Sequence, residues 1–258
     1  MASLSLKNVC KVYPNGFEAV KDFSLEVEDK EFIIFVGPSG CGKSTTLRMI
    51  AGLEEISDGT LKIDDKVVND VEPKDRDIAM VFQNYALYPH MTVYDNIAFG
   101  LDVKKWKKAD IRRRVDELVE LVGLKGFEKR YPNQLSGGQR QRAWIAMTLA
   151  QETEMILLDE PTTYLDMAYQ LDVLQLLERM NREKQLTIVM VLHDLNEACR
   201  FADHIIGLKN GKVVCEGKPA DVITRENIRE IYGIDAKLVM SDGGYPICME
   251  FDRVIKTL

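Results

Sequence analysis

The residues Gly37 to Thr45, GPSGCGKST, constrain the fold of this chain more than any other stretch. They fit the pattern G-x-x-x-x-G-K-[ST], which requires a strand before it and a helix after it. The preceding EFIIFVG is a continuous apolar run that ends in glycine, typical of a strand buried on both faces, and the following STTLRMIAGL reads as a helix. The pattern therefore predicts a strand, a loop and a helix in the required order, as in a parallel α/β sheet.

Such a loop is suited to hold phosphate groups. Its backbone N–H groups and the following helix N-terminus would surround the phosphates, Lys43 would reach the β and γ oxygens, and the Ser44 hydroxyl would bind Mg²⁺. A glycine-rich turn that matches by chance is the alternative, and the order of strand, loop and helix argues against it. The residues expected at the phosphates are Gly37, Pro38, Ser39, Gly40, Cys41, Gly42, Lys43, Ser44 and Thr45.

Three further apolar runs, RDIAMVF, EMILLDE and LTIVMVLHD, repeat the buried-strand pattern with helix-like stretches between them. Polar residues follow each run, at the carboxyl end where α/β sheets bind ligands. Asp159 is expected to hold Mg²⁺, and Glu160 to act as general base for an attacking water. Gln83 and His193 occupy equivalent strand ends and are expected to contact the γ-phosphate and the water. An acidic capping pair and ordinary surface residues are the alternatives, and the neighbouring phosphate loop disfavours them.

The remaining patterns predict the domain organisation. SLSLKNVCKVY and DFSLEVED predict a small N-terminal antiparallel sheet, because apolar and polar residues alternate in the second of them. Residues 84–134 lack a buried-strand pattern and are interpreted as a helical insertion, with one helix ending at Gly123. Residues 1–83 and 135–240 form the predicted α/β core. HIIGLKNGKVVCEG predicts a hairpin with Asn210-Gly211 at its turn, and residues 241–258 a strand-like tail.

Composition excludes several classes of function. The net charge of −7 gives no general attraction to nucleic acid, so no nucleic-acid partner is expected. Five scattered cysteines without a CxxC motif indicate reduced thiols in a cytoplasm. The N-terminus has no signal-peptide pattern, and no apolar run is long enough to span a membrane. A basic cluster from Lys104 to Arg114 could touch lipid headgroups and is interpreted as a solvated helix face.

The phosphate loop, Gln83, LSGGQRQR (135–142), MILLDE (155–160), TTYLD (162–166) and His193 come in an order that resembles the ATPase subunits of ABC transporters. The resemblance covers nearly the whole chain and implies the ABC type of phosphate-loop α/β fold, with ATP and Mg²⁺ as cofactors. Tyr13 could be an ordinary strand aromatic, but the resemblance implies that it stacks on adenine. It also implies that Gln83 is the Q-loop residue and a metal contact, Glu160 the catalytic base, Asp166 the D-loop residue and His193 the switch histidine.

The resemblance also explains why a second anion-binding stretch, LSGGQ, stands before a helix. In this family two subunits stack head to tail, and the LSGGQ of one closes on the ATP that the other holds. Ser136, Gly137, Gly138 and Gln139 are therefore expected at the ATP of a second copy. The implied partners are that copy and integral-membrane permease subunits, with the protein peripheral on the inner face of the cell membrane.

A separate ATPase without a long coiled coil or a fused membrane part fits an importer. A phosphate-loop kinase or GTPase switch is the alternative, and it leaves LSGGQ unexplained. Residues up to about Gly100 resemble sugar-importer ATPases, whereas those from Arg142 on resemble iron-siderophore importers. Together with a chain that stops at Leu258, without the regulatory domain of sugar-type ATPases, this slightly favours the siderophore class. The remaining hypotheses are a sugar importer and a recombined or engineered chimera without a natural permease.

Overall fold

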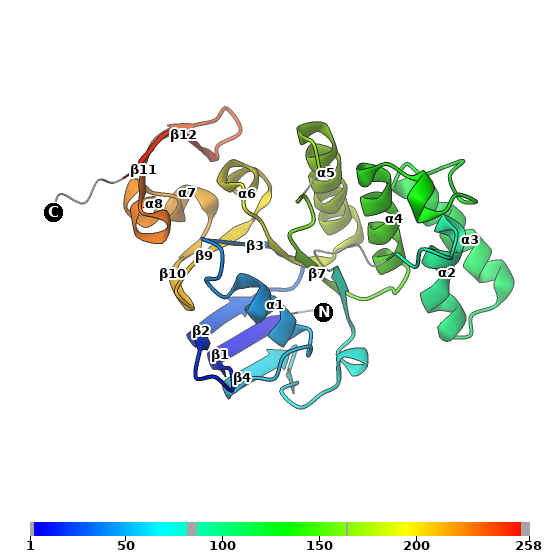
Figure 1. The fold of residues 1–258 in the computed structure, drawn as a ribbon, viewed down its shortest axis with the longest axis horizontal. Helices are drawn as coiled ribbons and strands as arrows, with labels where there is room; N and C mark the ends of the chain where they lie inside the picture. The colour runs from blue at the N-terminus through cyan, green and yellow to red at the C-terminus, as the bar shows by residue number, and fades with distance from the viewer. Residues whose placement is uncertain (1–2, 82–86, 164, 254–258) are drawn as a thin grey trace.

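A computed structural model describes residues 3–81, 87–163 and 165–253. At its centre is a six-stranded sheet in the order β10-β9-β3-β8-β7-β6 (Figure 1). Neighbouring strands from β9 to β6 are parallel, and only the edge strand β10 runs antiparallel. The strands of this sheet are β3 (Phe32–Val36), β6 (Ile78–Val81), β7 (Met155–Asp159), β8 (Thr187–Val191), β9 (His204–Lys209) and β10 (Lys212–Gly217).

The four apolar runs expected to form buried strands are β3, β6, β7 and β8. Every residue of β3, β7 and β8 is buried, because other strands flank them and apolar layers cover both faces. In β3, Phe32, Ile34 and Val36 belong to one apolar cluster, and Ile33 and Phe35 to the other. The run in β6 differs: it lies at the sheet edge and buries only alternate residues.

A second, four-stranded antiparallel sheet lies beside α1 at the N-terminal end of the chain, in the order β2-β1-β4-β5 (Figure 1). Its strands are β1 (Leu4–Val12), β2 (Glu18–Val27), β4 (Asp58–Ile63) and β5 (Lys66–Val67). The predicted pairing of the first two strands is confirmed, since β1 and β2 are antiparallel. The sequence analysis missed β4 and β5, which are mostly half-buried or exposed and so lack a continuous apolar run.

The helices are α1 (Lys43–Ile50), α2 (Val93–Val103), α3 (Lys108–Leu121), α4 (Gly137–Leu149), α5 (Met167–Lys184), α6 (Leu195–Phe201), α7 (Pro219–Val222) and α8 (Arg225–Tyr232), with 3₁₀ turns at Pro73–Asp75 and Pro132–Gln134. Among the described helices, none combines the length and apolar character needed to cross a membrane.

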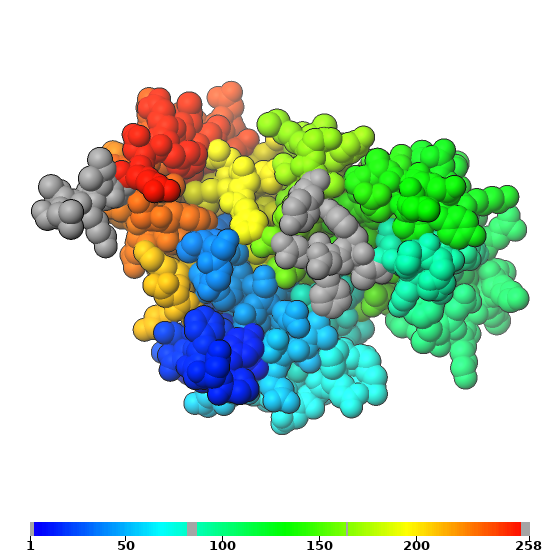
Figure 2. Space-filling view, in the orientation of Figure 1, coloured from blue at the N-terminus to red at the C-terminus, as the bar shows by residue number. Residues whose placement is uncertain are grey.

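The predicted insertion contains α2 and α3, and α3 ends just before Gly123, whose φ of 67° is typical of a residue that stops a helix. With α4 these helices form a lobe at one end of the molecule (Figure 2). Helix α4 packs against α2 and α3, but also against β6 and α5. It therefore joins the lobe to the sheet, and the domain boundary at residue 134 stays a prediction.

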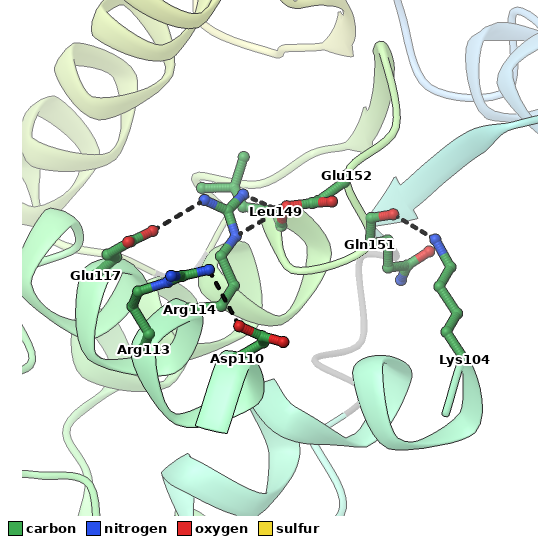
Figure 3. Close-up of polar contacts among 8 residues, drawn as sticks. All are labelled: Lys104, Asp110, Arg113, Arg114, Glu117, Leu149, Gln151 and Glu152. Carbon is green, nitrogen blue, oxygen red and sulfur yellow. Dashed lines mark hydrogen bonds and ion pairs between the residues drawn. The ribbon is translucent and has the colours of Figure 1, made fainter. Parts of the chain in front are cut away.

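The basic cluster that starts at Lys104 is not wholly the solvated face expected from the sequence. Lys104 Nζ donates to the Gln151 carbonyl oxygen at 2.7 Å, and an Arg114 guanidinium nitrogen donates to the Leu149 carbonyl oxygen at 3.3 Å (Figure 3). Arg114 also lies 3.4 Å from a carboxylate oxygen of Glu152. The contacts of Lys104 with Gln151 and of Arg114 with Glu152 hold the lobe to the segment that leads from α4 into β7, and the contact with Leu149 holds α3 to the end of α4.

Two hairpins complete the chain. The predicted one joins β9 to β10, with Asn210 and Gly211 at φ values of 50° and 80°, the conformation that a two-residue hairpin turn requires. The second pairs β11 (Ile234–Met240) with β12 (Pro246–Arg253) at the opposite end of the molecule from the helical lobe (Figure 2). The strand-like tail predicted from residue 241 thus contains β12, the second strand of this hairpin.

Candidate functional site

The phosphate loop lies at the carboxyl end of β3 and leads directly into α1. Gly42, the residue before the helix, has a φ of 104°, and a Cβ atom there would stand only 2.6 Å from the Ala19 carbonyl oxygen. Gly37 has a φ of 146°, and a Cβ atom there would collide with the Leu208 carbonyl oxygen. Both backbone conformation and lack of space thus require glycine at these two positions.

Lys43 is buried at the start of α1, an unusual place for a lysine. Its ammonium group donates to the carbonyl oxygens of Gly37 and Pro38, at 2.8 and 3.0 Å, which holds it inside the curve of the loop. Among the described residues, no side chain caps the helix start. The loop thus combines a fixed positive charge with the positive end of a helix dipole, which favours an anion.

Ser44, in the first turn of α1, contacts Asp159, the last residue of β7. The Ser44 hydroxyl donates to a carboxylate oxygen of Asp159 at 2.8 Å. Burial raises the pKa of Asp159 above its usual range, and the hydrogen bond from Ser44 opposes that shift. A hydroxyl and a carboxylate are the hard oxygen donors that Mg²⁺ prefers, and a divalent cation would offset the cost of the buried carboxylate. The described part of this site therefore fits Mg²⁺.

Glu160 and His193 form a second pair at the carboxyl end of the sheet. Glu160 directly follows Asp159 in the chain. His193 Nε2 lies 2.6 Å from Glu160 Oε1. The Thr163 hydroxyl donates to the other Glu160 carboxylate oxygen at 3.3 Å. Glu160 has a φ of 53°, a left-handed conformation that is uncommon for a residue other than glycine and is often found at functional sites. The sequence analysis did not single out Thr163, although it follows Glu160 in the run DEPTT.

A pocket of about 250 Å³ opens over the phosphate loop. Its lining consists of Tyr13, Phe17, Ala19, Ser39, Gly40, Gly42, Lys43, Ser44, Thr45 and Glu160. The rings of Tyr13 and Phe17 are nearly parallel, with centroids 6.4 Å apart, at the turn between β1 and β2. The pocket thus joins an aromatic end to an anion-binding end. Phe17 was missed in the sequence, where its position in YPNGF, just after a turn, was the available signal.

The residues of LSGGQ are not among those that line this pocket within the described part of the chain. Ser136 instead caps α4: its hydroxyl accepts from the Gln139 N–H at 3.3 Å, and the Gln139 side chain accepts from the Ser136 N–H at 3.0 Å. A Cβ atom at Gly138 would stand 2.8 Å from the ring of Tyr169. Within one chain, LSGGQ therefore begins a helix without joining the phosphate loop.

Asp166 has a local role in the structure, because its carboxylate accepts from the Tyr169 N–H at 3.2 Å and caps α5. Ser136 and Asp166 thus begin the two helices that meet at Gly138 and Tyr169. Gln83, the predicted Q-loop and metal residue, lies outside the described residues.

The family model described as "ABC transporter" matches residues 20–163. The oligosaccharides import ATP-binding protein MsmX of Bacillus subtilis is 51% identical over 222 residues, which are 86% of this chain and 61% of MsmX. The sn-glycerol-3-phosphate import ATP-binding protein UgpC of Psychromonas ingrahamii is 49% identical over 86% of this chain and 60% of its own length. The chain thus spans about three fifths of the length of these curated relatives.

A dimeric structure of the ATP-binding cassette MJ0796, in a post-hydrolysis state with ADP and Pi, is also similar. It has a TM-score of 0.76 and 38% identity, over 83% of this chain and 98% of that chain. The described fold is accordingly that of an ABC ATPase cassette.

These comparisons do not support two of the expectations. The alignment to MsmX is 222 residues long, so it must continue past Arg142. The relatedness to sugar-importer ATPases therefore extends into the part that was expected to be siderophore-like. The hypothesis of a chimera therefore lacks support, and so does the preference for iron-siderophore uptake, since neither of these importers is named for a siderophore. The match over more than half of the chain shows that the protein belongs to the ABC transporter family.

Proposed function

We propose that this chain is the ATP-binding and ATP-hydrolysing subunit of an ABC importer. The observation that carries the proposal is the convergence, at one sheet edge, of the buried Lys43, the Ser44–Asp159 pair and the Glu160–His193 pair. This set offers a positive charge for phosphate, oxygen ligands for a metal ion and a carboxylate at the position of a general base.

The division of roles follows from the contacts. Lys43 and the glycine N–H groups bind the β- and γ-phosphates, and Tyr13 stacks on the adenine at the other end of the pocket. Ser44 and Asp159 would hold Mg²⁺, with Gln83 as the third proposed contact, and the ion would supply positive charge to offset that of the phosphates. Glu160 takes a proton from the attacking water, and His193 orients the Glu160 carboxylate through the 2.6 Å contact.

We also propose that two copies stack head to tail around two ATP molecules. Ser136, Gly137, Gly138 and Gln139 would then contact the ATP of the other copy, which fits their absence from the lining of the described pocket. Asp166, beside them at the start of α5, would lie at the same interface. The dimeric structure of MJ0796 supports this arrangement. A membrane permease is the proposed further partner, with the protein peripheral on the inner face of the membrane.

For the substrate class, the sugar-type hypothesis is now the better one. MsmX is named for oligosaccharides and UgpC for sn-glycerol-3-phosphate, so a carbohydrate or polyol phosphate is the proposed cargo. Reconstitution with an oligosaccharide permease should raise the rate of ATP hydrolysis. Stimulation by an iron-siderophore permease alone would refute this assignment.

Replacing the proposed base tests the central assignment. Glu160→Gln keeps the size of the side chain but removes its basicity, so ATP hydrolysis should fall by about two orders of magnitude or more. MgATP binding should persist and trap a dimer, measured by size-exclusion chromatography. Glu183→Gln on the exposed side of α5 is the control and should behave as wild type. Wild-type turnover in Glu160→Gln would show that another group is the base.

A further inference from the structure

A buried lysine contacts the ring of Tyr13 from outside the pocket. Lys11 Nζ lies 5.1 Å from the centre of the Tyr13 ring, within the range of a cation–π contact. Lys11 lies on β1 and Tyr13 directly after it, two positions further along the chain. Within the described chain Lys11 is not part of the pocket lining, whereas Tyr13 is. Lys11 therefore meets the pocket through its contact with Tyr13.

Lys11 is held by the segment that follows α1. Its ammonium group lies 3.3 Å from a carboxylate oxygen of Glu54 and donates to the Glu55 carbonyl oxygen at 2.8 Å. The Lys11 side chain is only 11% exposed and that of Glu54 22%, so this ion pair is screened less by solvent than a surface pair. The contacts fix the position of the ammonium group under the ring.

The same carboxylate group reaches back to α1. The other oxygen of Glu54 lies 3.6 Å from the guanidinium group of Arg48, in the last turn of the helix. The main chain reinforces the connection, because the N–H groups of Leu53 and Glu54 donate to the Arg48 carbonyl oxygen. Tyr13 is thus connected through Lys11 and Glu54 to the end of the helix whose start carries Lys43 and Ser44.

We propose that Lys11 is a positioning residue for recognition of the nucleotide base. Lys11 and Glu54 fix the Tyr13 ring relative to α1, and α1 fixes the phosphate-binding end. The Tyr13 ring and the phosphate loop are then connected to opposite ends of one short helix of about 12 Å, at 1.5 Å for each of its eight residues. This inference rests on the proposed function, since it takes the pocket to bind ATP.

The electrostatics act in the same direction as the geometry. A cation held near one face of an aromatic ring draws electron density from the ring, which strengthens offset stacking of an electron-rich purine on the other face. Loss of the charge should weaken binding of the base and leave the phosphate contacts unchanged. A residue needed only for folding would affect both ends of the ligand equally.

The test compares two ligands, MgATP and magnesium tripolyphosphate, which has the phosphates but no base. Dissociation constants are measured by calorimetry for wild type, Lys11→Met and Lys11→Arg. Lys7→Met, an exposed lysine on the same strand, is the matched control. Lys11→Met should bind MgATP about threefold to thirtyfold more weakly and tripolyphosphate as wild type does, while Lys11→Arg should recover most of the MgATP affinity.

A second variant separates misfolding from loss of positioning. Lys11→Met with Glu54→Gln removes both charges of the pair, so no unpaired carboxylate is left, and it should show the same selective loss for MgATP. Equal losses for both ligands would overturn the inference and make Lys11 a structural residue. If wild type binds MgATP no better than tripolyphosphate, the proposed nucleotide site itself is wrong and the inference fails with it.

Discussion

The imidazole of His193 and the carboxylate of Glu160, 2.6 Å apart, join the carboxyl ends of two neighbouring strands, β8 and β7. The contact holds Glu160 over the phosphate loop, where it also lines the pocket. The Glu160 carboxylate is therefore oriented by His193, which follows the neighbouring strand, and also by the Thr163 hydroxyl. Fixed direction is what a general base needs, because proton transfer requires a short and aligned contact.

Removing the imidazole should consequently affect turnover more than binding. We expect His193→Ala to lower kcat for ATP hydrolysis by about two orders of magnitude or more and to leave the affinity for MgATP within a few-fold of wild type. Steady-state hydrolysis and equilibrium binding measure the two effects. The exposed His90, replaced by alanine, is the control and should change neither. A large loss of binding in His193→Ala would show instead that this histidine is needed for the nucleotide pocket.

Replacing Asp159 by asparagine should have opposite effects on the stability of the fold and on ATP hydrolysis. Burial raises its pKa, so the folded protein holds the Asp159 proton more tightly than the unfolded chain does. Ionisation at neutral pH therefore destabilises the fold, and this penalty is absent only at pH values below the unfolded pKa. Asp159→Asn should raise the free energy of unfolding by about 0.5–2 kcal/mol at pH 7 and abolish Mg²⁺-dependent hydrolysis.

The measurement is denaturant unfolding of wild type and Asp159→Asn at pH 7, without nucleotide. Asparagine keeps an oxygen that can accept from the Ser44 hydroxyl, so the hydrogen bond need not be lost. Asp172→Asn on the surface of α5 is the control, with an expected change below about 0.5 kcal/mol. A destabilised Asp159→Asn variant would mean that the carboxylate stabilises the fold more through its partners than burial disfavours it.

The parallel part of the fold could be predicted because burial on both faces leaves a plain mark in a sequence. β3, β7 and β8 read as unbroken apolar runs, since no residue in them faces water. The same reasoning fails for β4 and β5, because most of their residues are half-buried or exposed and they lack a continuous apolar run. It also assigned Arg114 to a solvated face, because a contact with the Leu149 carbonyl oxygen depends on how α4 packs against α3.

The site follows the same division. Ser44 and Asp159 could be brought together from sequence alone, because a phosphate loop and a strand end share one edge of a parallel sheet. The contacts of Phe17 and Lys11 with Tyr13 were not predicted, since they depend on the irregular end of β1 and on the turn that follows it. The siderophore preference rests on short stretches of the chain, whereas the similarity to the oligosaccharide import protein MsmX extends over 86% of the chain and does not support that preference.

Glu197, in the first turn of the helix after His193, predicts a pH dependence of stability. Burial, and secondly the nearby Asp194 carboxylate, raise the pKa of Glu197 to about 7. Between pH 4.5 and 7 the unfolded chain loses this proton while the folded protein keeps it, so this group lowers stability as pH rises and has its full effect above pH 7. Glu197→Gln should therefore be equal to wild type near pH 4.5 and about 1 kcal/mol more stable at pH 8.

Thermal unfolding at a series of pH values gives the comparison. Glu183→Gln, at an exposed position, should follow wild type throughout. A stability difference between Glu197→Gln and wild type that does not change from pH 4.5 to pH 8 would contradict the shifted titration.

The last prediction concerns the two stretches that the single chain keeps apart. Lys43 lies in the phosphate loop, whereas Ser136 caps α4 and lines no part of the described pocket. Lys43→Ala should abolish hydrolysis by removing the phosphate contact, and Ser136→Arg should abolish it by blocking closure on the second copy. A mixed dimer of the two variants has one composite site with both defects and one with neither.

If the sites act independently and subunits exchange freely, an equal mixture of the two variants should regain on the order of a quarter of the wild-type rate of hydrolysis. The reason is that half of the dimers are mixed, and each mixed dimer has one intact site. Hydrolysis is measured before and after mixing, with each variant mixed with itself as the control. No recovery, despite subunit exchange confirmed with differently tagged copies, would show that each chain completes its own site and that LSGGQ does not act across a dimer.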